Sequence, residues 1–110
     1  MKNVFILGLL ALSLSGCATA LTHEATRITQ VDQNQKSQVQ NCKSMGEVVG
    51  TSSYGGLFMQ EAGKNYAKNQ AMNEAANMRA THIVWTTAEG GFFGGKAYGV
   101  AYNCSKVAAN

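Results

Sequence analysis

Four segments of the chain carry apolar and polar residues in patterns typical of β-strands. Residues 45–52, MGEVVGTS, combine β-branched residues with flanking turn formers. Residues 81–88 and 97–104 have the same character, and residues 26–31 add a fourth strand-like segment. A polar connection, residues 32–41, separates this last segment from residues 45–52. The pattern therefore predicts a small sheet of about four strands.

A helix is predicted between the second and third of these strands. Residues 61–80 contain no proline and many good helix formers, with Ala67, Ala71, Ala75 and Met78 at helical spacing. Because this stripe is mostly alanine, the helix backbone can come close to the surface that it covers. The last strand offers such a surface, since alternation along a strand separates its small side chains from its large ones. The small residues are Ala97, Gly99 and Ala101, and those on the other face are Tyr98, Val100, Tyr102 and Cys104.

The order of these segments predicts an α+β domain in which a small mixed sheet packs against one main helix, in β-β-α-β-β order. Strands joined by a helical crossover run parallel, so residues 81–88 are expected to run in the same direction as residues 45–52. The glycine-framed turn EGGFFGGK, residues 89–96, then closes a hairpin that returns the chain in the opposite direction.

The N-terminus has the pattern of a targeting segment. Lys2 precedes an apolar run, residues 4–14, that is too short to span a bilayer as a permanent helix. The ending Leu-Ser-Gly-Cys, residues 14–17, resembles a bacterial lipobox, in which the cysteine is acylated and the preceding segment is removed. The alternative is an ordinary secretory signal in which Cys17 has no role. Ala18 follows the cysteine, at a position where inner-membrane lipoproteins of enterobacteria resemble one another in carrying Asp. The lack of Asp here favours the outer membrane, with the domain facing the periplasm.

These features divide the chain into four parts. Residues 1–16 are predicted to be a lipoprotein signal peptide, residues 17–25 the lipidated N-terminus and a tether, residues 26–105 an α+β periplasmic domain, and residues 106–110 a C-terminal tail. Fully extended, the tether would reach about 25 to 30 Å from the membrane at 3.3 to 3.6 Å per residue.

The cysteines are odd in number, which calls for an explanation in a secreted protein. Lipidation of Cys17 leaves Cys42 and Cys104 as a pair, which an oxidising periplasm would convert to a disulfide. The predicted topology agrees, because Cys42 lies just before the second strand and Cys104 ends the last strand, at the same end of the sheet. Only a modest core can form in a mature chain of this size. A disulfide between Cys42 and Cys104 would therefore matter, because closing the loop between them would stabilise the folded state by up to about 4 kcal/mol.

Two glycine-rich loops are predicted to lie together at the opposite end of the sheet. Residues 53–60, SYGGLFMQ, and residues 90–95, GGFFGG, carry apolar side chains that packing cannot easily bury. Exposed apolar patches on small domains often mark interaction sites. The alternative is that some of these side chains fold back and cap the core. The candidate interaction residues are Tyr54, Leu57, Phe58, Phe92 and Phe93.

Charge and composition argue against several function classes. After removal of the signal peptide, eight basic side chains stand against six acidic ones, scattered along the sequence, whereas nucleic-acid binding usually needs a clustered basic face. Asp32 is the single aspartate, and His23 and His82 without a Cys-x-x-Cys spacing fall short of a zinc site. Glu47 and Glu89 would act as an acid and a base only if they shared a cleft with His82. We therefore expect no catalytic residue, no metal and no cofactor.

Three stretches of the sequence resemble the small bacterial lipoproteins grouped as domain of unknown function 4156. They are CKSMGEVVG at residues 42–50, NQAMNEAANMRATHIVW at residues 69–85 and AYGVAYNC at residues 97–104. The shared pattern is a cysteine before Gly-Glu-Val, an Ala- and Asn-rich helix that ends directly in a hydrophobic strand, and a last strand ending in Ala-Tyr-x-Cys. The resemblance covers roughly residues 26–105.

More distantly, the chain is similar to the C-terminal domain of the outer-membrane lipoprotein that senses envelope stress for the Rcs phosphorelay. That domain also has Gly-Glu-Val-x-Gly, here residues 46–50, and a helix corresponding to residues 71–80. It has two disulfides and a proline-rich tether, whereas this chain has one cysteine pair after Cys17 and no proline. The resemblance therefore implies the fold more than the sensing role.

The sequence as a whole predicts an outer-membrane lipoprotein that acts by binding and not by catalysis. The membrane would hold it through acyl chains on Cys17, and the two loops would contact a protein of the cell envelope. The alternative function is an envelope-stress or small-ligand sensor whose signal depends on the bridge between Cys42 and Cys104.

Overall fold

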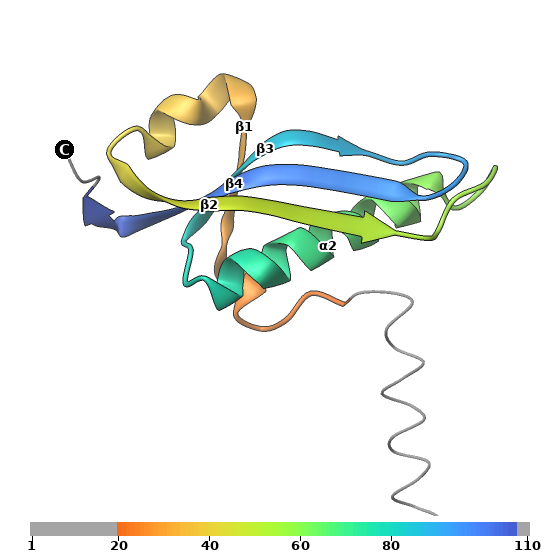
Figure 1. Cartoon of the computed structure of the whole chain (residues 1–110), viewed down its shortest axis with the longest axis horizontal. Coiled ribbons are helices and arrows are strands. Elements are labelled where there is room, and N and C mark those ends of the chain that lie inside the picture. The colour runs from red at the N-terminus through yellow and green to blue at the C-terminus, as the bar shows by residue number, and fades with distance from the viewer. Residues whose placement is uncertain (1–19, 108–110) are drawn as a thin grey trace, which may run out of the picture.

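The computed structural model describes residues 20–107 of the 110-residue chain (Figure 1). The predicted signal peptide and Cys17 lie outside the described residues. The elements, in chain order, are the 3₁₀ turn η2 (Ala25–Arg27), β1 (Thr29–Asp32), the 3₁₀ segment η3 (Gln33–Val39), β2 (Cys42–Ser52), α2 (Gln60–Asn77), β3 (His82–Glu89) and β4 (Gly95–Val107).

The predicted α+β architecture and its β-β-α-β-β order are confirmed. Several boundaries differ from the predictions. β2 begins at Cys42, three residues earlier than predicted, and α2 ends at Asn77, three residues before the predicted end. The first strand begins at Thr29 and not at residue 26, because Ala25–Arg27 form a 3₁₀ turn that buries Ala25. The last strand continues to Val107, two residues into the predicted tail.

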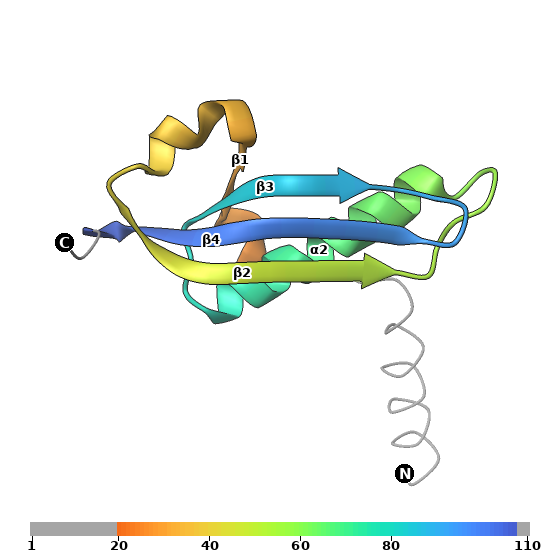
Figure 2. The ribbon, with the colours of Figure 1, turned by 45° about the horizontal axis from the view of Figure 1, so that its top comes forward.

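The four strands form one mixed sheet in the order β1-β3-β4-β2. β1 pairs parallel with β3, while β2 and β3 both pair antiparallel with β4. β2 and β3 therefore run in the same direction, as predicted for strands joined by a helix, and β4 lies between them (Figures 1 and 2). β2 is consequently an edge strand of the sheet.

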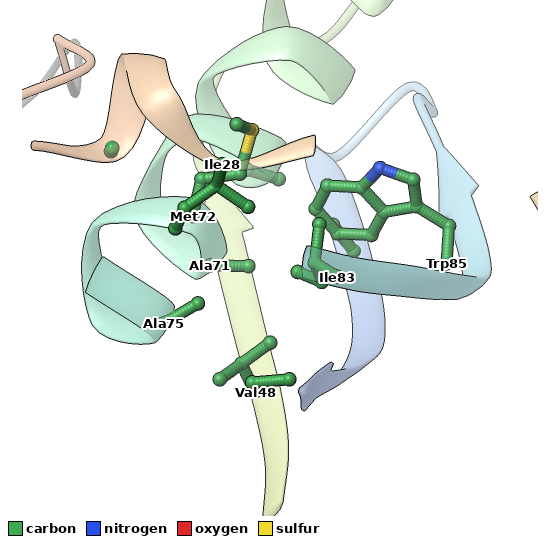
Figure 3. Packing of buried hydrophobic residues seen from close by; sticks show 11 residues of the cluster. Ile28, Val48, Ala71, Met72, Ala75, Ile83 and Trp85 are labelled. Atoms are coloured by element: carbon green, nitrogen blue, oxygen red, sulfur yellow. The ribbon is translucent and has the colours of Figure 1, made fainter. Parts of the chain in front are cut away.

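The main core lies between α2 and one face of the sheet. The small residues of β4 face the helix as predicted, and Ala97 and Ala101 are fully buried with Ala67, Ala71 and Ala75. Figure 3 shows Ala71, Met72 and Ala75 on the helix close to the side chains of Val48, Ile83 and Trp85. Because both layers present mainly small side chains, the helix backbone approaches the sheet closely.

Gly50 of β2 shows how close this approach is. A β-carbon added at Gly50 would lie 1.8 Å from the backbone oxygen of Ala67 and 2.9 Å from the backbone nitrogen of Ala71. Both are main-chain atoms of α2, which cannot move aside without the helix. The sheet therefore accepts only glycine at this point.

Trp85 closes one side of the same core. Its ring is buried, and its indole N–H donates to Oε1 of Gln30 on β1 at 2.9 Å. The ammonium group of Lys68 on α2 lies 5.2 Å from the ring centroid. This contact is within the range of a cation–π interaction, so Trp85 links α2, β3 and β1.

A second, smaller cluster covers the other face of the sheet. Val31, Val39 and Val84 are buried there, packed against Cys42, Tyr102 and Cys104. Val39 comes from η3, within the segment predicted to be only a polar connection. That prediction was incomplete, because a single valine among polar residues is enough to dock η3 onto the sheet.

The Cys42–Cys104 disulfide is confirmed and lies beside this second cluster. It joins the first residue of β2 to β4, the neighbouring antiparallel strand. The predicted topology placed both cysteines at this end of the sheet.

The segment predicted to be a free tether packs against the domain from Ala20 onward. The side-chain amide of Asn73 on α2 donates to the carbonyl oxygen of Ala20 at 2.8 Å, and its oxygen accepts the backbone N–H of Thr22 at 2.9 Å. Leu21 packs against the main core, and Ala25 is buried in it. The prediction of a tether over residues 17–25 was therefore wrong for residues 20–25, because these contacts fix them to α2.

The free edge of β2 carries a side-chain cap. The backbone N–H of Thr51 donates to Oε1 of Gln70 on α2 at 2.6 Å. This donor is satisfied by the helix that crosses the sheet, and not by another strand.

Candidate functional site

Two loops come together at the end of the sheet opposite the disulfide. The β2–α2 loop, residues 53–59, leaves one strand, and the β3–β4 loop, residues 90–94, joins the two others. The backbone N–H of Gly56 donates to the carbonyl oxygen of Phe92 at 2.7 Å, which links the two loops directly. The loops lie together as the predicted topology requires, and Figures 1 and 2 show them projecting beyond the sheet.

Glycines allow the two loop backbones to pack with no side chain between them. A β-carbon at Gly55 would lie 2.4 Å from the carbonyl oxygen of Phe92, and one at Gly90 would lie 2.0 Å from that of Gln60. Gly94 has a φ of +137°, a conformation that residues with side chains rarely adopt. The glycines therefore let the two loop backbones approach each other closely.

Five large apolar side chains of the loops are exposed, and we call the four most exposed of them, Leu57, Phe58, Phe92 and Phe93, the apolar tip. Phe58 and Phe93 are each 93% exposed, Leu57 is 80% exposed and Phe92 is 60% exposed. The rings of Phe92 and Phe93 contact each other edge to face, with centroids 5.3 Å apart. These side chains do not fold back to cap the core in this structure.

Tyr54, the fifth candidate interaction residue, has a different place. Its side chain is half-buried, and its ring packs edge-on against that of Tyr66 on α2, with centroids 5.0 Å apart. Its backbone N–H donates to Oγ of Ser52 at 3.1 Å. Tyr54 therefore fixes the base of its loop to the helix and is not part of the apolar tip.

The apolar tip carries no charge, and the charged side chains near its base have opposite signs. Neither residues 53–59 nor residues 90–94 contain an ionisable acid or base other than Tyr54. Glu61 and Lys64 form an ion pair of 3.1 Å on the first turns of α2. Glu89 and Lys96 are directly opposite each other in the β3–β4 register. The surface at this end is therefore apolar at its extremity and close to neutral behind it.

The three residues considered for acid–base chemistry do not share a cleft. Glu47 is paired in register with Val100, whereas Glu89 and His82 lie at opposite ends of β3. β4 separates Glu47 from β3. Nδ1 of His82 lies 2.8 Å from Oγ1 of Thr81, so this ring interacts with its own neighbour.

A cavity of about 370 Å³ lies at the disulfide end of the sheet, far from the apolar tip. It is an open hollow between η3 and the sheet, and its lining includes one cation and no carboxylate. The lining residues are Lys36, Ser37, Val39, Gln40, Cys42 and Tyr102.

The part of the chain that the structure describes is residues 20–107. In this part of the chain, no three His, Cys, Asp or Glu side chains gather as metal ligands would. None of its helices is long and apolar enough to cross a membrane. The predicted lipidation site, Cys17, lies outside the described residues.

Comparison with known proteins yields no relative: no family model matches the sequence, and no curated protein or solved structure matches it. The resemblance to the lipoprotein family and to the Rcs sensor domain therefore remains a prediction.

Proposed function

We propose that this chain is a lipid-anchored, non-catalytic interaction module of the bacterial outer membrane, and that the apolar tip is its binding surface. The observation that carries the proposal is the exposure of four large apolar side chains on two loops that are hydrogen-bonded to each other. Burying one such side chain contributes about 1.5 to 3 kcal/mol, so covering the apolar tip would favour binding strongly. The lipobox-like sequence before Cys17 supports the anchoring part of the proposal.

The fixed geometry of the two loops supports a role of the apolar tip in binding. Gly55, Gly90 and Gly94 let the two loop backbones lie in close contact. Tyr54 and Tyr66 brace the base of the first loop. A surface held in this way needs little reordering when a partner covers it, which lowers the entropic cost of association.

A second candidate function is a sensor that responds at the disulfide end. The cavity of about 370 Å³ includes Cys42 in its lining, so a small molecule bound there would lie next to the bridge. This candidate needs the bridge to change state while the domain stays folded, and reduction of the domain tests it directly.

Replacing Phe92 and Phe93 with serine is expected to abolish binding through the apolar tip and to leave the fold intact. Because both rings are mostly exposed, the substitutions should change the free energy of unfolding by no more than about 0.5 kcal/mol. The measurement is photocrosslinking in intact cells, with a reactive residue at Phe58 in the parent chain and in the Phe92→Ser/Phe93→Ser variant. Mass spectrometry then compares the adducts.

A reactive residue at Lys68, on α2 and away from the loops, provides the control. We expect a specific adduct from Phe58 that is missing from Lys68 and lost in the double variant. Equal adducts from both positions, or adducts that survive the double substitution, would rule out the apolar tip as the binding surface.

A further inference from the structure

We propose that the apolar tip inserts into the lipid leaflet that holds the acyl chains of Cys17, so that the domain is fixed to the membrane at two points. This inference rests on the lipid anchor in the proposed function and names the partner of the same surface. It replaces the expected envelope protein with the lipid surface itself, for three reasons given by the structure.

The first reason is the shortness of the connection between the anchor and the domain. Asn73 on α2 binds the backbone of Ala20 and Thr22, so the chain is fixed to the helix from Ala20 onward. Only Ala18 and Thr19 lie between that point and Cys17. Three consecutive residue steps span at most about 11 Å. An acylated Cys17 would therefore hold this part of α2 close to the membrane surface.

The second reason is that the apolar tip extends from the same helix. The backbone of Gly90 packs against Gln60, the first residue of α2, and Asn73 lies thirteen residues further along. At 1.5 Å per residue, the two points are about 20 Å apart along the helix axis. Figure 1 shows the first described residues running beside α2 and the two loops projecting past its N-terminal end. A domain lying with α2 along the membrane would bring both points to one surface.

The third reason is the chemistry and shape of the apolar tip. A specific protein interface usually buries about 800 Å² on each partner and needs complementary shape, whereas the apolar tip is a small projection with four side chains. A lipid surface accepts apolar side chains without any complementary shape. The loops carry no acidic group, and the ion pair between Glu61 and Lys64 leaves no excess negative charge behind them to repel anionic headgroups.

The test uses the full lipidated chain, purified in detergent and reconstituted into vesicles of phosphatidylethanolamine and phosphatidylglycerol. Some of the phospholipid carries bromine on its acyl chains, which quenches the fluorescence of tryptophan in contact with lipid.

The parent chain supplies the baseline, because its single tryptophan, Trp85, is buried in the core. Phe93→Trp places a second tryptophan on the apolar tip. Val49→Trp is the matched control, since Val49 is 40% exposed and points away from α2, on the opposite side of the strand from the buried Val48.

We expect the added emission of the Phe93→Trp chain to fall about twofold or more with brominated lipid, while the Val49→Trp and parent chains stay near baseline. An unquenched Phe93→Trp chain, together with a protein adduct from Phe58 in cells, would overturn lipid insertion and leave the binding surface in place. An unquenched chain with no specific adduct from Phe58 would overturn both proposals. Quenching of the Val49→Trp chain to the same extent would also overturn this inference, because lipid contact would then not be specific to the apolar tip.

Discussion

Replacing both Cys42 and Cys104 with alanine is expected to lower the free energy of unfolding by up to about 4 kcal/mol, the largest effect of any change considered for this domain. The two residues are separated by 62 positions, and closing so long a loop removes much of the conformational freedom of the unfolded chain. Domains of this size are stable by only about 5 to 15 kcal/mol, so the loss would be a large part of the total. A urea titration followed by the fluorescence of Trp85, on a chain that begins at residue 18, measures the difference.

Reduction of the parent domain is the matched control for this prediction. If the bridge serves only stability, the reduced parent and the double alanine variant should unfold at similar urea concentrations. A reductant that changes a cellular output while Trp85 remains in its folded environment would favour the sensor function instead. A double variant as stable as the parent would contradict the expected contribution of the bridge.

Gly50→Ala is expected to cost about 3 kcal/mol of stability, at the upper end of the range for overfilled cores. The added methyl group would lie 1.8 Å from the backbone oxygen of Ala67, and only a displacement of α2 could relieve this contact. Such a displacement would also open the alanine-lined interface on which the main core depends. Thermal and urea unfolding of the variant chain measure the loss.

Val49→Ala is the matched control for Gly50→Ala. Val49 is the preceding residue of β2, but it is partly exposed on the face of the sheet that α2 does not cover. Removing its two methyl groups should change stability by less than about 1 kcal/mol. If Gly50→Ala proved as stable as Val49→Ala, the close approach of helix and sheet would not be the constraint that we infer.

Local patterns in the sequence were sufficient to predict most of the fold. The alternation along residues 97–104 identified which face of the last strand the helix covers, and the alanine spacing of residues 61–80 identified the matching face of the helix. The disulfide could be predicted because two cysteines remain after Cys17 and the predicted strand directions place both at the same end of the sheet. Each of these features depends on residues that are close in sequence or on a single covalent constraint.

The parts that were missed depend on contacts between distant residues. Asn73 binds the backbone of Ala20 and Thr22, more than fifty residues away, and one asparagine in a helix rich in asparagine gives no sign of this role. The place of β4 between β2 and β3 is likewise a choice among strand orders that the sequence leaves open. At the candidate site, the loops could be located from topology, but the inward position of Tyr54 depends on its contact with Tyr66.

The cap that Gln70 places on Thr51 matters for contacts between copies of this protein. An unpaired edge strand is a template on which another chain can add a strand. Because Gln70 already occupies the N–H of Thr51, continuous pairing along β2 would first have to break that bond. The helix that builds the core thus also hinders neighbouring copies from aggregating edge to edge.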